Sequence, residues 1–349
     1  MVRNIAALLC ILTLGAVAHA EPTAAPIPVK VVVVSMFEIG KPTGDAPGEY
    51  QFWVERQKLD HIYPFPLGEY DLRMNDQGLL GICTGGGTSN ATASIMALGL
   101  DPRFDLSKAY WVIAGIAGGD PHDVSLGTAA WARHVVDGDL LYEIDAREIP
   151  AKWPYGLMPL GAKQPNGKST GWTVDTIHFP LNAKLAEWAY AVTKDHPVAD
   201  SPGIAAFRKL YKGYPNALRP PFVTLGDNLS ASTYWHGDKL NQWANDWMHL
   251  QAGKDSNFMM ADMEDSGTLT ALRRLSRTQR IDLNRVLVLR TASNYSMQPK
   301  GKAAAWSTTA AYPEDGRPAL EAAYQVGNQV VQKLINGWPV YRDSLPAQP

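Results

Sequence analysis

The sequence is poor in cysteine and has a single long apolar run, and both shortages limit what the protein can be. Cys10 lies inside the apolar run near the N-terminus, and Cys83 is the only other cysteine. Once that run is removed, Cys83 has no partner for an internal disulfide, a zinc ribbon or a redox pair of thiols. No later segment reaches the roughly 20 apolar residues of a membrane-spanning helix. We therefore expect the rest of the chain to be water-soluble and unable to form a pore by itself.

The sequence also lacks an excess of either charge. Its 32 lysines and arginines and 34 aspartates and glutamates give a formal net charge of −2, without long runs of one sign. This pattern excludes a basic stripe for a nucleic acid polymer and a cationic face for a membrane. A small neutral ligand is then the natural kind of partner.

Four well-known signatures of cofactor, nucleophile and metal sites are absent. The glycine-rich residues 84–90 lack the Lys-Ser/Thr of a phosphate loop and the last glycine of the dinucleotide fingerprint. There is no G-x-S-x-G elbow for a serine nucleophile. The eight histidines form no metal-ligand pattern such as H-E-x-x-H. We therefore predict that the protein uses neither a metal nor a nucleotide cofactor.

The first 20 residues have the pattern of a secretory signal peptide. Arg3 precedes an apolar run over residues 5–17, and Ala18-His19-Ala20 forms an A-x-A cleavage site before Glu21. Lipid attachment is not expected, because the residues before Cys10 are leucines rather than small residues. We predict cleavage after residue 20, a spacer over residues 21–28, and a soluble periplasmic or secreted protein.

The remaining chain alternates apolar strand patterns, glycine turns and helical patterns. Residues 29–35 form a near-continuous β-branched run, which is typical of a strand buried on both faces. A second apolar run over residues 109–114 breaks at the glycines of residues 115–119, and a third over residues 286–289 is followed by the polar residues 290–295. This alternation predicts a three-layer αβα sandwich with a central mixed sheet.

We predict one domain over residues 29–345, with an insertion or cap over the Pro-, Gly- and Trp-rich residues 151–221. In proteins with such a sheet, ligands bind beyond the ends of the strands. Glycine-rich strand ends are either tight connections or backbone that closely approaches a ligand. The acidic residues 262–265 are likewise either partners of a helix dipole or carboxylates that face a ligand.

Six segments, in order along the chain, resemble the nucleoside phosphorylase and nucleosidase superfamily, and more closely its branch called the purine nucleoside permease family. The resemblance covers nearly the whole chain after the leader and implies the nucleoside phosphorylase-like fold. The matching segments are Val31-Val-Val-Val-Ser35-Met36-Phe37-Glu38, the glycine loop at residues 84–90, Ala114-Gly115-Ile116-Ala117-Gly118-Gly119 as the G-x-A-G-G turn, Gly226-Asp227-Asn228, Asp262-Met263-Glu264, and Ser293-Asn294.

The resemblance implies roles for individual residues. Glu264 would accept hydrogen bonds from the ribose hydroxyls, and Met263 would form an apolar wall against the sugar. Ser293 and Asn294 would face the purine, with Asn294 bonding N7 or a 6-oxo group. The remaining candidates are Gly86, Gly87, Gly118 and Asn228 for substrate binding, and Phe37, Tyr234 and Trp235 for stacking on the base.

The same resemblance leaves two nucleophiles open, phosphate and water. Phosphorolytic relatives place an arginine before the G-x-A-G-G turn, where this chain has Ile113 and Ala114. Phosphate stays open as a co-substrate, but Glu38 could instead activate a water as general base, or be a solvated loop carboxylate. Because Asn294 cannot deliver the full proton that an aspartate would, we expect 6-oxopurine nucleosides to be preferred over adenosine.

The sequence therefore favours an exported purine nucleoside-binding protein that cleaves the N-ribosidic bond, by hydrolysis or phosphorolysis, in nucleoside uptake and salvage. The alternative is a non-catalytic nucleoside-binding component that supports transport across a membrane, with a membrane uptake partner. Assembly into a homo-oligomer, which is common in the superfamily, stays open.

Overall fold

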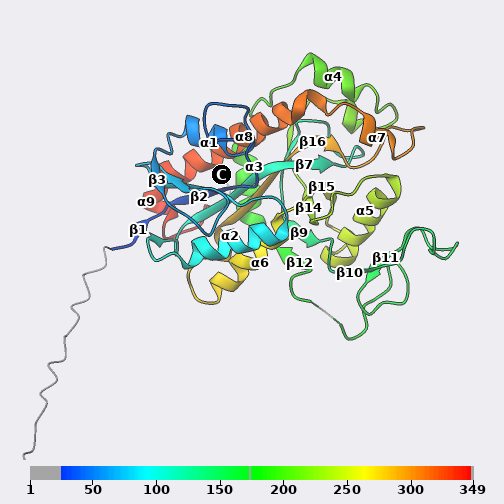
Figure 1. The fold of residues 1–349 in the computed structure, drawn as a ribbon, viewed down its shortest axis with the longest axis horizontal. Coiled ribbons are helices and arrows are strands. Elements are labelled where there is room, and N and C mark those ends of the chain that lie inside the picture. The colour runs from blue at the N-terminus through cyan, green and yellow to red at the C-terminus, as the bar shows by residue number, and fades with distance from the viewer. Residues whose placement is uncertain (1–24, 173, 347–349) are drawn as a thin grey trace, which may run out of the picture.

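A computed structural model describes residues 25–346 except residue 173 (Figure 1). The signal peptide predicted for residues 1–20 lies outside the described residues. Among the described residues, we find no helix whose length and apolar character would let it cross a membrane.

The centre of the fold is strand β2 (Val31–Ser35), in which every residue is buried. It lies between two parallel neighbours, β5 (Leu79–Cys83) and β7 (Tyr110–Gly119). The β-branched side chains of β2 alternate between the two faces of the sheet and pack on both. The strand predicted from the valine run is confirmed.

The main sheet is mixed, as the alternation of strands and helices predicted. Its strands follow the order β12, β9, β14, β15, β7, β2, β5, β4, β3, while β16 pairs with β7 and β8, and β13 pairs with β8. The other strands are β3 (His61–Tyr63), β4 (Leu72–Met74), β8 (Ala129–Trp131), β9 (His134–Asp137), β12 (His178–Pro180), β13 (Val223–Leu225), β14 (Asp227–Ser230), β15 (Phe258–Asp262) and β16 (Val286–Tyr295). Two short pairs lie apart from it: β1 (Ile27–Pro28) with β6 (Phe104–Asp105), and β10 (Leu141–Glu143) with β11 (Leu157–Pro159).

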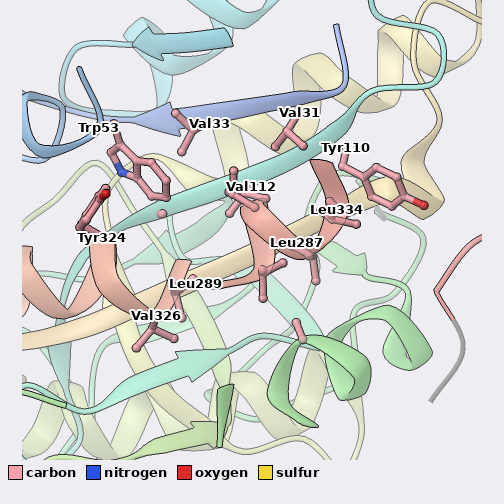
Figure 2. Packing of buried hydrophobic residues seen from close by; sticks show 14 of the residues in the cluster. Val31, Val33, Trp53, Tyr110, Val112, Leu287, Leu289, Tyr324, Val326 and Leu334 are labelled. Atoms are coloured by element: carbon pink, nitrogen blue, oxygen red, sulfur yellow. The ribbon is translucent and has the colours of Figure 1, made fainter. Parts of the chain in front are cut away.

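Helices cover both faces of the sheet. Val31 and Val33 face α1 (Gln51–Arg56), α3 (Ala183–Thr193) and α8 (Arg317–Asn336) in one apolar core (Figure 2). Val32 and Val34 face α2 (Thr88–Leu100) and α6 (Asp265–Ser276) in the other. Helices α1 and α8 thus lie on the opposite side of the sheet from α2 and α6 (Figure 1). This is the predicted αβα sandwich.

Four further helices complete the described fold. Helix α5 (Asp238–Ala252) packs Trp243 and Trp247 in a third apolar cluster beside β9 and β14. The shorter helices are α4 (Pro202–Arg208), α7 (Trp306–Thr309) and α9 (Trp338–Tyr341).

Two strands are longer than the sequence predicted. The glycines of residues 115–119 do not break β7, and the polar residues 290–295 do not cap β16 but belong to it. The reason is their mutual pairing, which runs from Val286 opposite Trp111 to Tyr295 opposite Gly119. Ladder hydrogen bonds along this length outweigh the low strand propensity of glycine. The predicted turn at residues 115–119 was therefore wrong.

Residues 151–221 contribute to the sheet as well as to its surroundings. Strand β12 pairs with β9 at one edge, and helix α3 buries Leu185 and Trp188 in the core with α8. Strand β11 forms an antiparallel pair with β10 away from the sheet (Figure 1).

Candidate active site

A cavity of about 230 Å³ lies where strands β2, β7, β15 and β16 end. The chain segments that follow or end these strands supply most of its walls. The cavity is lined by Met36, Phe37, Glu49, Ile116, Ala117, Tyr234, Ala261, Asp262, Met263, Glu264, Ser293, Asn294 and Tyr312.

A β-bulge brings two consecutive side chains of β16 to this cavity. Ala292 pairs with Ala117 and Asn294 pairs with Gly118, so Ser293 has no opposite residue on β7. In a regular strand Ser293 and Asn294 would point to opposite faces of the sheet. The extra residue changes the direction of the strand locally, and both side chains line the cavity.

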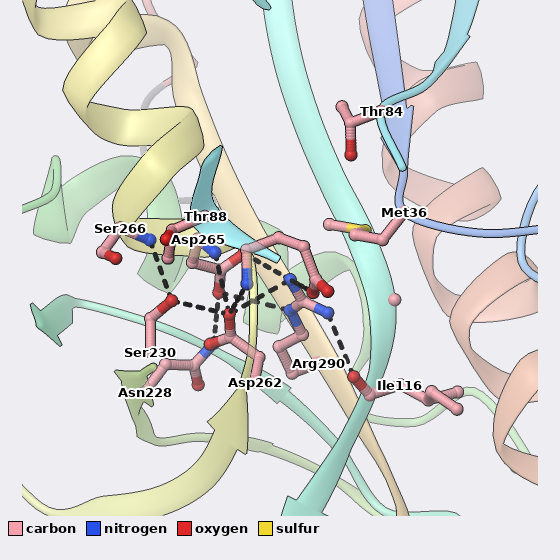
Figure 3. Close-up of polar contacts among 12 residues, drawn as sticks. Met36, Thr84, Thr88, Ile116, Asn228, Ser230, Asp262, Asp265, Ser266 and Arg290 are labelled. Carbon is pink, nitrogen blue, oxygen red and sulfur yellow. Dashed lines mark hydrogen bonds and ion pairs between the residues drawn. The ribbon is translucent and has the colours of Figure 1, made fainter. Parts of the chain in front are cut away.

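The floor of the site is a buried network of charges around Arg290 (Figure 3). The Nη2 atom of Arg290 lies 2.6 Å from Asp265, 3.3 Å from Asp262 and 3.4 Å from Glu264. Its Nη1 atom donates to the carbonyl of Ile116 at 3.0 Å. One guanidinium thus faces three carboxylates, so negative charge is in excess at the floor.

Asp262 is the carboxylate that ties this network to the start of α6. One of its oxygens accepts hydrogen bonds from the backbone N–H groups of Glu264 and Asp265, at 2.9 and 2.8 Å, and from the Ser230 hydroxyl at 3.0 Å. Burial, followed by the charge of Asp265, raises the pKa of Asp262 well above its usual range. Its other oxygen has no hydrogen-bond partner among the described residues.

Glu264 is held from two sides. Its Oε1 atom accepts the backbone N–H of Gly87 at 3.1 Å, and its Oε2 atom lies 3.4 Å from Arg290. The side chain is fixed at the cavity wall, next to Met263, with further lone pairs for ligand hydroxyls. The ribose-binding role of Glu264 stays a prediction.

Glu49 is a cavity carboxylate that sequence reasoning missed. Its two oxygens accept the backbone N–H groups of Met36 at 2.8 Å and Ile116 at 2.7 Å, and the residue is buried. Burial raises the pKa of Glu49 to about 7; Arg290 opposes this shift and Glu264 adds to it. A carboxyl group with this pKa is suited to proton transfer near neutral pH.

Glu38, the predicted general base, does not line this cavity. Its carboxylate accepts the backbone N–H groups of Ile39, Gly48, Tyr50 and Gln51. It thereby organises the loop that carries Glu49 and the first turn of α1. The sequence signal that could have singled out Glu49 is its position just before helix α1, where a long loop returns to the end of β2.

The other predicted residues divide into three groups. Phe37, Met263, Ser293, Asn294 and Tyr234 line the cavity. Gly118 and Trp235 line a small neighbouring hollow, where Trp235 also packs edge-on against Trp243 at 5.7 Å between ring centroids.

The third group lies behind the site or beside it. The buried Asn228 donates to Asp265 at 2.9 Å and supports the charge network rather than the cavity wall. Gly87 supplies the N–H that holds Glu264. Gly86 is exposed, and an added side-chain atom there would meet nothing within 4 Å.

Among the described residues, no group of three or more His, Cys, Asp or Glu side chains is placed to hold a metal ion.

Comparison with known proteins identifies the family. The sequence model of the purine nucleoside permease family matches residues 28–346, which is nearly all of the described chain. The chain belongs to this family. It is 28% identical over 338 residues to a protein of Schizosaccharomyces pombe described as a probable purine nucleoside permease, covering 88% of this chain and 90% of that one. It is also 28% identical over 315 residues to a purine nucleoside permease of Candida albicans, covering 88% and 75% of the two chains.

Solved structures confirm the nucleoside phosphorylase-like fold. The 5′-methylthioadenosine/S-adenosylhomocysteine nucleosidase of Neisseria meningitidis superimposes with a TM-score of 0.51 at 14% identity, covering 87% of this chain and 99% of that chain. The futalosine hydrolase of Helicobacter pylori superimposes with a TM-score of 0.50 at 12% identity, covering 86% and 98%. At these identities the likeness concerns the fold alone.

Proposed function

We propose that this family member binds a purine nucleoside in the cavity and hydrolyses its N-ribosidic bond outside the cytoplasm. The observation that carries the proposal is the meeting of Glu49, Glu264 and Asn294 in one cavity. They supply the three things the reaction needs: a base for the nucleophile, a holder for the ribose and a hydrogen-bond partner for the purine.

Glu49 would activate the nucleophile. A water placed beside its ionised carboxylate loses a proton to Glu49 as its oxygen bonds to C1′ of the ribose. The electron pair of the C1′–N9 bond passes to the purine, which accepts a hydrogen bond from Asn294, takes up a proton from solvent water and leaves. The raised pKa of Glu49 makes its carboxylate a stronger base than an ordinary glutamate.

The carboxylates of the floor would favour the transition state. As the C1′–N9 bond stretches, positive charge develops on the ribose ring. With Asp262 favouring its protonated form, Glu264 and Asp265 still outnumber the single guanidinium of Arg290, so fixed negative charge lies beside the cavity without reorganisation.

The hydrogen bonds of Arg290 favour water over phosphate as the nucleophile. An anchor for phosphate needs a guanidinium or ammonium group with free donors. Arg290 already donates to Asp262, Glu264, Asp265 and the Ile116 carbonyl. Phosphate as a co-substrate is the less favoured form of the proposal.

A second candidate function is nucleoside binding without cleavage, in support of transport through a membrane partner. Asn294 favours it, because an amide can bond the purine but cannot protonate it. The curated relatives described as permeases also support it.

The decisive experiment incubates the chain with inosine, with and without phosphate, and follows the release of hypoxanthine. We expect release that does not depend on phosphate, and its loss in Glu264→Ala. The control is Glu143→Ala, which removes an exposed glutamate of β10. Phosphate-dependent release would mean phosphorolysis, and calorimetric binding without release would mean the transport role. Full activity of Glu264→Ala would disprove the site.

A further inference from the structure

A second, larger cavity of about 360 Å³ adjoins the candidate active site. The two cavities share three residues: Tyr234, Asn294 and Tyr312. The rest of its lining comes from α4, the segment after it, His236, the end of β16 and residues 304–313, and includes Phe207, Tyr211, Tyr295 and Trp306.

The walls of the second cavity are largely apolar and come from aromatic rings and alanines. The rings of Tyr211 and Tyr295 lie 4.0 Å apart between centroids, and those of Phe207 and Trp306 lie 6.2 Å apart. The two tyrosine hydroxyls bond elsewhere, to the carbonyls of Met297 at 3.0 Å and Ala217 at 2.9 Å. Such a cavity suits an apolar group of a ligand rather than a charged one.

The one titratable imidazole of this cavity fits that description. Burial lowers the pKa of His236 below its ordinary value, which favours the uncharged ring. The ring therefore adds no positive charge to the wall near neutral pH.

Asn294 stands at the boundary between the two cavities and fixes which part of the ligand reaches the second one. An asparagine amide can pair with both N7 and the six-position amino group of an adenine. In the proposed function the ribose would contact Met263 and Glu264, which line the first cavity and not the second. A nucleoside in this orientation directs its six-position substituent past Asn294.

We infer that the site accepts purine nucleosides whose six-position amino group carries an apolar substituent, and that the second cavity holds that substituent. The inference rests on the proposed function, because it uses the same orientation of the nucleoside. A substituent at the 5′ position of the ribose would start from the sugar end. The second cavity shares none of Met36, Phe37, Glu49, Met263 and Glu264, which line only the first.

The test compares three ligands on the full chain by calorimetry: adenosine, N6-benzyladenosine and 5′-benzylthio-5′-deoxyadenosine. The Glu49→Gln variant is used so that the ligands are not consumed. We expect N6-benzyladenosine to bind at least about tenfold more tightly than adenosine, because the benzyl group is removed from water. The 5′-substituted ligand should show no such gain.

A pair of variants locates the gain. Ala304 lines the second cavity and not the first, whereas its neighbour Ala303 is exposed and lines neither. In the same background, Ala304→Trp should fill the cavity and abolish the gain from the benzyl group, while leaving the Kd of adenosine within about twofold. Ala303→Trp should keep the gain.

Each other outcome is decisive. Equal affinity for adenosine and N6-benzyladenosine, a gain that survives Ala304→Trp, or a gain limited to the 5′-substituted ligand would overturn the inference and leave the proposed function intact. If neither inosine nor adenosine binds the unmodified chain, the proposed function fails, and this inference fails with it.

Discussion

At the scale of single residues, the environment of each carboxylate decides its chemistry. Glu38 and Glu49 belong to the same loop, but Glu38 is surrounded by four backbone N–H groups and Glu49 is buried against a cavity. The four N–H groups engage the Glu38 carboxylate within the loop, whereas burial of Glu49 raises its pKa to about 7. The two glutamates are therefore suited to different tasks: one organises the loop and the other transfers a proton.

Glu49→Gln should lower kcat for inosine by at least about 100-fold, because an amide cannot accept a proton from water. In the unchanged protein, kcat/KM should fall as the pH decreases through about 7, since the base must be ionised and burial raises its pKa to about 7. The measurement is a pH–rate profile. Glu38→Gln serves as the matched control and should keep the fall of kcat/KM at acidic pH. If this fall is lost in Glu38→Gln and kept in Glu49→Gln, Glu38 is the general base instead.

Asn294→Asp should shift the preference toward adenosine. A protonated aspartate donates a full proton to N7 of the leaving purine, which the amide cannot do. We expect the ratio of kcat/KM for adenosine over inosine to rise by at least about tenfold, and most at low pH, where the new aspartate is protonated. An unchanged ratio would mean that Asn294 does not contact the base.

At the scale of secondary-structure elements, two helices meet at glycines beneath the site. A side-chain atom added to Gly267, in the first turn of α6, would lie 2.2 Å from the backbone oxygen of Thr88 in α2. The two helix starts also carry Glu264 and Gly87, which bond each other. Close packing of α2 on α6 is therefore part of how the ribose-binding carboxylate is held.

Gly267→Ala should reduce the free energy of unfolding by about 1–3 kcal/mol, the typical cost of overpacking, because backbone atoms must move to admit the methyl group. Denaturant unfolding measures it. Gly86→Ala, in the neighbouring glycine loop with open space around the added atom, should be close to neutral in the same assay. An equal free energy of unfolding for the two variants would show that α2 and α6 can move apart to admit the methyl group without a loss of stability.

At the scale of the whole molecule, the predicted export and the proposed catalysis depend on different parts of the chain. The site is built from strands throughout the sheet, whereas the predicted leader lies outside the described residues. Export would place nucleoside cleavage where phosphate is not assured. This setting agrees with a mechanism that uses water.

Expression of the full chain in a bacterium should yield an exported protein that begins at Glu21, as read by mass spectrometry. Ala18→Arg should block this cleavage, because the A-x-A site requires small residues. Ala24→Arg lies beyond the site and should leave cleavage unchanged. A product that begins at Met1 in the exported fraction would contradict the predicted leader.

Local patterns determined much of the fold. The valine run of β2 and the apolar runs that begin β7 and β16 could be predicted, because each depends on residues near one another in the sequence. Strands β8 and β9 were missed, since short strands are fixed by the partners they pair with. The pairing of β7 with β16 likewise overrode the glycines that suggested a turn.

The sequence by itself indicated the family and a central sheet, and through the resemblance it pointed to Glu264 and Asn294 as candidate site residues. Only the tertiary structure decided which glutamate of the first loop reaches the cavity, that Arg290 is engaged by three carboxylates, and that a bulge turns Ser293 and Asn294 to the same side. The physical reason is that burial, charge and side-chain direction depend on residues far apart in the chain. These quantities exist only once the strands have paired and the loop has closed over their ends.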